Sequence, residues 1–360
     1  MNNFLLKIFG CGFSDDKNQA QNLPIQDMPD VVLEQILRNL DFRSLLKLRK
    51  VSRKFRNFID EFKPPSYVSS FYITVQSSKI SFELFFSPKS PSGTSRMNIE
   101  YTNQENGACL VTRRPMEKHL KNRNFIETAL QDFQVFIRHQ KSVLQMFRLD
   151  FDYYERKFYR MEVDEKIEPI VEKVLTGIEA ILSQRKLRVE EFSMSAVREP
   201  QVLKILPFLD SKTIRKIILD GRKCYPIDFL KIEKLENLEQ WKQAKELKIW
   251  RYNISVPMER FANFEIVELC FQRVPMDSVL KLKELFLNSP NIRRFVISFD
   301  TITDDSQLLF DSLGPFQQEM QQIGVKEKRW IFEEYKSMAK LKISMFSDCW
   351  FILFERVPRA

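Results

Sequence analysis

Side chains that could carry acid–base, nucleophilic or metal chemistry are few and scattered in this sequence of 360 residues. The two histidines, His119 and His139, have no second ligand cluster to complete a zinc site, and we expect both at the surface or its rim. The acidic clusters at 150–152 and 162–165 lack a partner base, so we assign them no acid–base role. No cysteine forms a C-x-x-C pair, which predicts reduced thiols rather than disulfides. The five cysteines are Cys11, Cys109, Cys224, Cys270 and Cys349.

Phosphate-binding loops also lack support, because the chain contains only 8 glycines. Neither a G-x-x-x-x-G-K pattern nor a G-x-G-x-x-G pattern occurs, so no motif indicates nucleotide binding. The sequence therefore predicts no catalytic residue, no metal site and no cofactor.

Basic residues, by contrast, are concentrated in one part of the sequence. The formal net charge is +9, a modest excess for this length, and much of it falls between residues 43 and 63. Such a run could bind nucleic acid, but we favour a solvated helix face, because the nearby Phe55, Phe58 and Phe62 lie on or near the apolar side. The basic residues are Arg43, Lys47, Arg49, Lys50, Arg53, Lys54, Arg56 and Lys63, against Asp60 and Glu61.

The elements that position this segment are three short helices predicted between residues 28 and 62. Pro29 suits a first helical turn, and Ser52 can cap the third helix. Apolar residues recur at helical spacing, and the resulting core is at the low edge of independent stability. We therefore expect the segment to gain stability by docking on a partner. The apolar positions are Leu33, Ile36, Leu37, Leu40, Leu45, Leu48, Val51, Phe55, Ile59 and Phe62.

After Pro64-Pro65 the apolar period changes from 3.6 to 2, which predicts a four-stranded antiparallel meander over residues 67–113. Helical patterns follow at 123–140 and near 165–185, on either side of a strand with the sequence QMFRLDF. The chain closes with LKISMFS and CWFILFERV, which we interpret as a terminal strand pair.

Between residues 190 and 298, strand-like runs alternate with helix-like segments at intervals of 20 to 30 residues. This period predicts an irregular leucine-rich-repeat-like arc with a parallel sheet. The positions that we take as equivalent in successive strands are Phe192, Ile217, Leu247, Val267 and Phe295.

The first helical segment resembles an F-box. It begins LPIQDMPDVVLEQILRNL at Leu23 and continues with LLKLRKVSRKF. Met28-Pro29 occupies the Leu-Pro-like start of the family pattern, and Phe55 stands where many members have Trp. The match covers about forty residues, and its specificity lies in many matching positions in the right order.

The remainder is similar to the FTH domain of nematode-type F-box proteins. The resemblance is carried by LEQWKQAKELKI (238–249), FANFEIVEL (261–269), SPNIRRFVISF (289–299) and WFILFERV (350–357). The chain has Asn263-Phe264 where family members often have His-Phe.

Together these resemblances imply a non-catalytic substrate-receptor subunit of an SCF-type cullin ubiquitin ligase. The F-box would bind a Skp-type adaptor, which links it to cullin and RING subunits, and the C-terminal domain would recruit an unidentified protein target. The target-binding residues stay unknown. The residues implied at the adaptor contact are Met28, Pro29, Leu33, Ile36, Leu37, Leu45, Leu48 and Val51.

The predicted organisation is a flexible tail (1–22), an F-box (23–65), an antiparallel β segment (66–115) and an FTH-type, leucine-rich-repeat-like α/β domain (116–360). The fold class is thus mixed α+β and α/β. No segment has the apolar length to cross a bilayer, and the start MNNFLLKIFGCGF lacks a cleavage site, so we expect a cytoplasmic or nuclear protein without membrane contact. Two alternatives remain: an interaction scaffold outside any ligase, and a nucleic-acid-binding protein that uses the basic helices at 43–63.

Overall fold

The structure is a computed structural model of the chain. It describes residues 25–40, 42–62, 64, 66–90, 96–104, 107–113, 115–157, 160–163, 166–195, 198–221, 230–252, 254, 256–274, 276–289, 291–302, 313–322, 325–333, 339–346 and 351–358. The chain divides into two compact units, residues 1–64 and residues 65–360. We call them the helical unit and the body. The predicted tail at 1–22 lies outside the described residues.

The helical unit contains the three predicted helices. They are α1 (Asp30–Arg38), α2 (Phe42–Val51) and α3 (Arg53–Phe62), preceded by a short 3-10 turn, η2 (Ile25–Asp27). The predicted cap is present, because the backbone N–H of Phe55 donates to Ser52 Oγ at 3.2 Å. The carbonyl of Pro29 likewise accepts from the N–H groups of Val32 and Leu33 as α1 begins.

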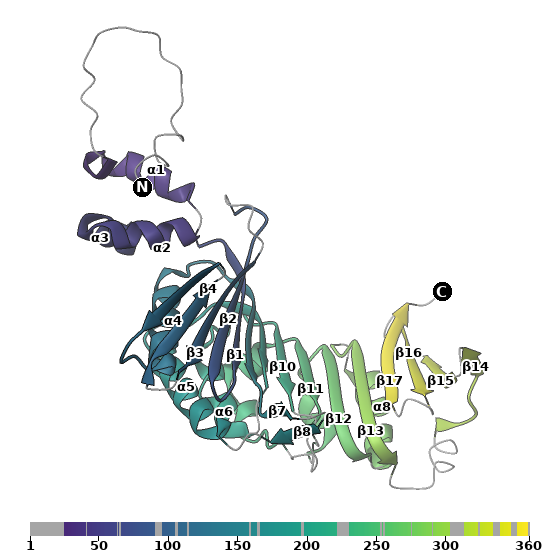
Figure 1. The fold of residues 1–360 in the computed structure, drawn as a ribbon. Coiled ribbons are helices and arrows are strands. Elements are labelled where there is room, and N and C mark those ends of the chain that lie inside the picture. Colours follow the sequence, from purple (N-terminus) through teal and green to yellow (C-terminus); the bar gives the residue numbers. More distant parts are fainter. Residues whose placement is uncertain are drawn as a thin grey trace. The chain divides into compact units, whose positions relative to one another are not determined.

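The body opens with the predicted antiparallel meander, which has one strand more than expected (Figure 1). Buried and half-buried residues alternate along the first two strands, so one face of the meander is buried. The strands are β1 (Val68–Val75), β2 (Lys79–Phe86), β3 (Arg96–Asn103), β4 (Cys109–Arg113) and the unpredicted β5 (Met116–Leu120).

Six parallel strands continue the sheet from the other edge of β1. The register confirms the predicted equivalences: Phe192, Ile217, Leu247, Val267 and Phe295 are successive Cα partners. The same row extends back through Phe147 to Phe71 of the meander. The strands are β6 (Leu144–Phe151), β9 (Val189–Met194), β10 (Lys216–Asp220), β11 (Glu246–Trp250), β12 (Ile266–Val274) and β13 (Arg294–Ile302).

Four antiparallel strands complete the far edge. The predicted terminal pair is present as β16 (Ala339–Phe346) and β17 (Phe351–Pro358), and β17 pairs with β13. The strands β14 (Gln318–Gln322) and β15 (Val325–Glu333) extend this edge and were not predicted. Within the described part of the body, these strands form one sheet of 15 strands, and β7 (Tyr154–Lys157) and β8 (Arg160–Val163) form a separate hairpin.

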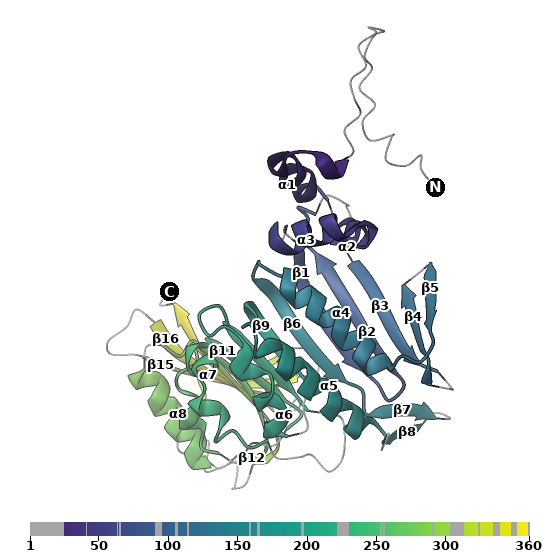
Figure 2. The same cartoon turned by 90° about the vertical axis from the view of Figure 1, so that its left-hand side faces the viewer.

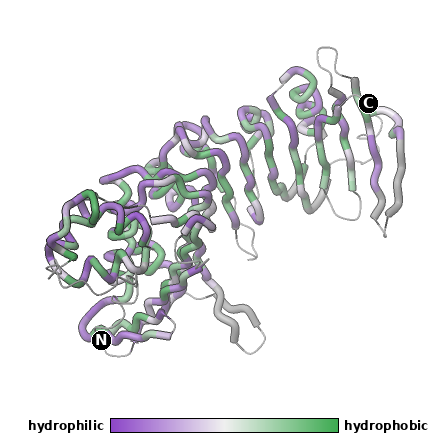
Figure 3. The backbone as a smooth tube through the Cα atoms, turned by 90° about the horizontal axis from the view of Figure 1, so that it is seen from above, coloured by the Kyte–Doolittle hydropathy of each residue, from purple (hydrophilic) through white to green (hydrophobic). Residues whose placement is uncertain are grey.

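Helices cover one face of this sheet (Figure 2). The predicted helices at 123–140 and near 165–185 are α4 (Phe125–His139) and α5 (Ile167–Leu182), and α8 (Met276–Asn288) is one of the helix-like segments expected between the strands. The shorter segments are α6 (Glu199–Leu203), η4 (Leu206–Phe208), η5 (Leu235–Asn237), α7 (Glu239–Gln243) and η6 (Met258–Phe261). Figure 3 shows that hydrophobic and hydrophilic residues alternate along many of the strands, as a sheet covered on one face requires.

Aromatic side chains form the core beneath α4. The ring of Phe71 lies 5.8 Å from that of Phe133 and 6.2 Å from that of Phe147, centroid to centroid. The ring of Phe147 in turn lies 6.2 Å from that of Phe192. These contacts join the meander to the parallel strands, so the sheet and its core continue across residue 115, where we expected a boundary.

Candidate functional site

The helical unit has a small core of its own. Leu33, Leu37, Leu45, Phe55 and Ile59 are all buried in one cluster. The half-buried residues packed around it are Ile25, Met28, Leu40, Leu48, Phe58 and Phe62. Each helix therefore contributes part of its predicted apolar stripe to the interior of the unit, while Ile36 and Val51 do not belong to this cluster.

This core accounts for five of the eight residues that we predicted at a partner contact. Leu33, Leu37 and Leu45 are buried within the unit, while Met28 and Leu48 pack half-buried against it. These five side chains therefore lie inside the unit or against its core, rather than on a surface that a partner could contact directly.

The other three predicted residues reach the solvent. Pro29 is exposed, Ile36 is half-exposed, and Val51 keeps 70 % of its surface accessible. Direct contact with a partner is open to these side chains without any unfolding of the unit.

The structure adds two exposed valines that we had not predicted, Val31 at 76 % and Val32 at 42 % exposure. Val32 falls three residues after Pro29 and four before Ile36, so these three residues form a stripe beside the buried one. The apolar arc of α1 is therefore wider than the core requires. In the sequence, the run Val31-Val32-Leu33 could have indicated an exposed apolar residue, because three consecutive residues of a helix cannot all face one core.

A paired charge fixes α2 against α3. Arg49 Nε and Nη2 donate to the two carboxylate oxygens of Asp60 at 2.6 and 2.8 Å. This hydrogen bonding raises the pKa of the Arg49 guanidinium above its ordinary value. Arg38 lies over the ring of Phe62, 5.0 Å from its centroid, and ties α1 to α3.

The uncovered face of the body's sheet carries ion pairs that link neighbouring strands. Lys216 Nζ lies 3.4 Å from Glu191 and 3.7 Å from Glu246, and Lys248 Nζ lies 2.8 Å from Glu268. Beyond Lys248 on the same strand, Trp250 is 41 % exposed, with the ammonium of Lys248 5.3 Å from its ring centroid. Exposed tryptophan is a common anchor of protein interfaces.

The structure describes some of the side chains that we considered for chemistry. Asp150 pairs with Arg148 at 2.6 Å, and Asp152 accepts a hydrogen bond from Gln76. His119 is exposed, as predicted, but His139 is buried at the end of α4 and our surface assignment was wrong. His139 is buried because it lies at the C-terminal end of the buried face of α4, after Phe136 and Ile137.

Cys270 is half-buried, and Cys109 is buried. Cys11, Cys224 and Cys349 lie outside the described residues, as do the side chains of the cluster at 162–165.

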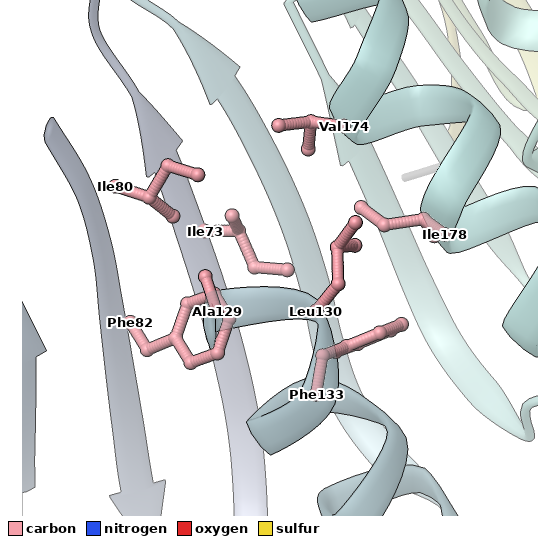
Figure 4. A pocket seen from close by; sticks show the side chains of 8 residues that line it. All are labelled: Ile73, Ile80, Phe82, Ala129, Leu130, Phe133, Val174 and Ile178. Atoms are coloured by element: carbon pink, nitrogen blue, oxygen red, sulfur yellow. The ribbon is translucent and has the colours of Figure 1, made fainter. Parts of the chain in front are cut away.

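A cavity between α4, α5 and the meander has a volume of about 10 Å³ (Figure 4). Its lining is apolar, and Figure 4 shows the side chains closing around it: Ile73, Ile80, Phe82, Ala129, Leu130, Phe133, Val174 and Ile178. This volume is at the limit for a single water molecule, so the cavity is a packing gap rather than a ligand site.

Within the described ranges, no three metal-ligating side chains come together. No helix among those residues is long and apolar enough to cross a membrane.

Comparison with known proteins agrees with this division of the chain. A model of the F-box domain matches residues 25–67, and a model of the FTH domain matches residues 172–312. The first match covers the helical unit, and the second runs from within α5 through β13.

A curated protein from Caenorhabditis elegans, F-box A protein 224, is 22 % identical over 278 residues. The alignment covers 76 % of this chain and 66 % of the relative, so the chain spans just under two thirds of that relative's length. No solved structure matches the chain.

Proposed function

Because the chain carries an F-box domain followed by an FTH domain, as nematode-type F-box proteins do, we propose that it is a substrate-receptor subunit of an SCF-type cullin ubiquitin ligase. The F-box domain implies a role of this kind in general. The finer proposal is that the helical unit docks on a Skp-type adaptor, and through it on cullin and RING subunits. The chain itself performs no catalysis in this complex.

The observation that carries the proposal is the apolar arc of α1. Pro29, Val32 and Ile36 lie beside a core that is already complete without them. Burying such side chains in a partner removes apolar surface from water at about 25 cal/mol per Å². A helix face of this kind fits a hydrophobic groove on another protein.

The test is a binding titration of the full chain with a purified Skp-type adaptor. Val32→Asp combined with Ile36→Asp puts two carboxylates into the contact, and we expect affinity to fall at least about a hundredfold, or about 2.8 kcal/mol. The matched control is Met116→Asp, which charges an exposed apolar residue of the body. Adaptor binding that is absent in the wild-type chain, or unchanged in the double variant, would refute the adaptor proposal.

For target recruitment we propose the uncovered face of the sheet around Trp250. Its charged residues pair with one another, and Trp250 offers an apolar anchor at the end of β11. Once a target is identified by affinity purification with the body, hydrogen–deuterium exchange should report protection in β10, β11 and β12. Protection confined to the helix-covered face would contradict this assignment.

The proposal includes a leucine-rich-repeat-like description of β9 to β13 and a cytoplasmic or nuclear location. An experimental structure of the body would test the former through the regularity of its turns, and imaging of the tagged chain would test the latter. The alternative, an interaction scaffold outside any ligase, predicts that the adaptor binds but a bound target is not ubiquitylated.

A further inference from the structure

The body's sheet has an open edge at β5. The strand order ends with β5, which pairs with β4 on one side, and Figure 2 shows it at the outer limit of the meander. No other described strand lies along its second side. The backbone N–H and C=O groups of alternate residues point away from β4, so another extended chain can pair with them.

One face of β5 sets a cation between two apolar side chains. Met116, Lys118 and Leu120 share this face, because residues two apart in a strand point to the same side. It continues the face that α4 covers, since Leu120 is the cross-strand partner of Cys109, which is buried and hydrogen-bonded to Thr128 of α4. On β5, however, Met116 is 48 % exposed and Lys118 is exposed, so α4 leaves them uncovered.

The edge and the residues that follow it are basic. From Arg113 to Arg123 the sequence contains five basic residues and one acidic residue, Glu117. Lys118, Lys121 and Arg123 are exposed, and none of them forms an ion pair with any acid in the described ranges. We call these three residues the edge cations. Their neutralisation must come from outside the described part of the body.

The edge cations make a second copy of the chain a poor occupant of this edge. Antiparallel pairing of β5 with itself about its central residue would place Lys118 opposite Lys118, and like charges directly opposite each other destabilise a sheet. Short, charged edge strands oppose self-association in natural sheets for the same reason. A strand of opposite charge meets no such repulsion.

We propose that an extended, acidic segment of a partner protein adds a strand to β5. Its backbone would complete the open hydrogen bonds of the edge. Its side chains would match the exposed face: a carboxylate opposite Lys118, and apolar residues two positions away on either side, opposite Met116 and Leu120. Further carboxylates would lie beside Lys121 and Arg123.

This edge is separate from the surfaces assigned above. It includes neither the exposed residues of α1 nor the face around Trp250, and strand addition at β5 holds whether or not the chain binds a Skp-type adaptor. Failure of the adaptor titration and failure of peptide binding at β5 are therefore distinguishable results.

The same features argue against nucleic acid as the ligand. Three cations are few beside the about six to ten phosphate contacts typical of DNA-binding proteins. The strand reads MEKHL and contains no Phe, Tyr or Trp on which a base could stack. Open backbone groups fit a β-strand, which a nucleic acid does not supply.

The test is an anisotropy titration of the full chain with a fluorescein-labelled peptide, Glu-Thr-Glu-Val-Thr-Glu-Thr-Val. In antiparallel register this peptide places its valines opposite Met116 and Leu120 and a glutamate opposite Lys118. A second peptide has proline in place of each threonine, which keeps the charges and valines but removes backbone donors and disfavours strand pairing. We expect the proline peptide to bind at least about tenfold more weakly, and hydrogen–deuterium exchange should report protection of residues 115–121 by the threonine peptide alone.

Variants of the chain test the edge cations. K118E/K121E/R123E should weaken binding of the threonine peptide at least about tenfold, or about 1.4 kcal/mol, because three surface ion pairs are lost. The matched control is K186E/K212E/R215E, which makes the same charge change at three exposed residues between α5 and β10. It should alter affinity by less than about twofold. If the glutamate variant unfolds, K118Q/K121Q/R123Q decides, because it removes the same three pairs without adding negative charge.

Several results would overturn the inference. A wild-type chain that does not bind the threonine peptide, or binds both peptides equally, would exclude strand addition. Equal losses in both triple variants would mean that net charge alone attracts the peptide. Protection of residues 115–121 in a dimer without peptide would assign the edge to a second copy. Tighter binding of a DNA duplex, lost in K118E/K121E/R123E alone, would assign the edge cations to nucleic acid.

Discussion

Single side chains in α1 divide into those that complete a core and those that the core does not use. Leu33 and Leu37 belong to the first kind, and Val31 and Val32 to the second. The division gives each substitution a different meaning. Changing Leu33 should unfold the unit, whereas changing Val32 should alter only what the unit binds.

Tyr101 is the residue with the clearest pH signature. Its side chain is buried, and its hydroxyl donates a 2.7 Å hydrogen bond to Asp132 Oδ2 on α4. Burial, followed by the negative charge of Asp132, raises the pKa of Tyr101 well above its ordinary value of 10.0. The folded protein therefore keeps this proton where the unfolded chain loses it, and the resulting stability declines as pH rises above about 10.

We expect the free energy of unfolding to fall more steeply between about pH 9 and about pH 11 in the wild-type chain than in Tyr101→Phe. At neutral pH the variant should be less stable by about 1 kcal/mol, because the hydrogen bond to Asp132 is lost. Urea denaturation at each pH measures both effects. If the free energy of unfolding depends on pH in the same way in both proteins, Tyr101 is not the source of this pH dependence.

Between elements, the contact of α2 with α3 depends on one ion pair with two hydrogen bonds. The Arg49 and Asp60 side chains are only 19 % and 26 % exposed, so water screens them incompletely. Asp60→Asn should cost about 1–2 kcal/mol, because it removes the charge from a bidentate pair. Hydrogen exchange of the α2 and α3 amides measures this loss.

Lys54→Gln serves as the control for that substitution. Its pair with Asp27 joins side chains that are 60 % and 48 % exposed. Such pairs contribute little, so the exchange rates should hardly change. If both variants accelerate hydrogen exchange equally, the partly buried Arg49–Asp60 pair stabilises the unit no more than the exposed Lys54–Asp27 pair.

Elements with a clear apolar period could be predicted from the sequence, and those defined by their neighbours could not. The equivalence of Phe192 with Ile217 followed from alternation, and the register confirms it. By contrast, β5 reads MEKHL and β14 reads QEMQQ, and neither sequence alternates apolar with polar residues. They are strands because β4 and β15 present unpaired backbone groups to them.

The candidate site was predictable only in part, for a related reason. The stripe of Leu33 and Leu37 is strong in the sequence because it is the core. The exposed Val31 and Val32 could not be separated from it, since sequence period reports which side chains are apolar but not how many of them the neighbouring helices can cover.

For the body as a whole, the continuous sheet predicts that residues 65–360 fold as one unit. Removing the meander would expose the backbone edge of β6 that hydrogen-bonds to β1. It would also expose the ring of Phe147, which lies 6.2 Å from that of Phe71. We expect a fragment of residues 116–360 to aggregate, because an exposed hydrophobic strand edge templates association. A fragment of residues 65–360 should be folded, and size-exclusion chromatography of the two distinguishes these outcomes.

A monomeric, folded fragment of residues 116–360 would show that the meander is a separate domain. It would place an independent boundary near residue 115, in spite of the pairing of β1 with β6.

The strands β9, β10, β11, β12 and β13 lie in the sheet in the order in which they occur in the chain. Each of the three inner strands, β10, β11 and β12, therefore hydrogen-bonds only to the strands that precede and follow it. A chain built this way can acquire or discard one strand with its covering helix while the register on both sides is preserved. Duplication or deletion of one such unit would then lengthen or shorten the sheet by one strand and leave the sequence of α1, α2 and α3 unchanged.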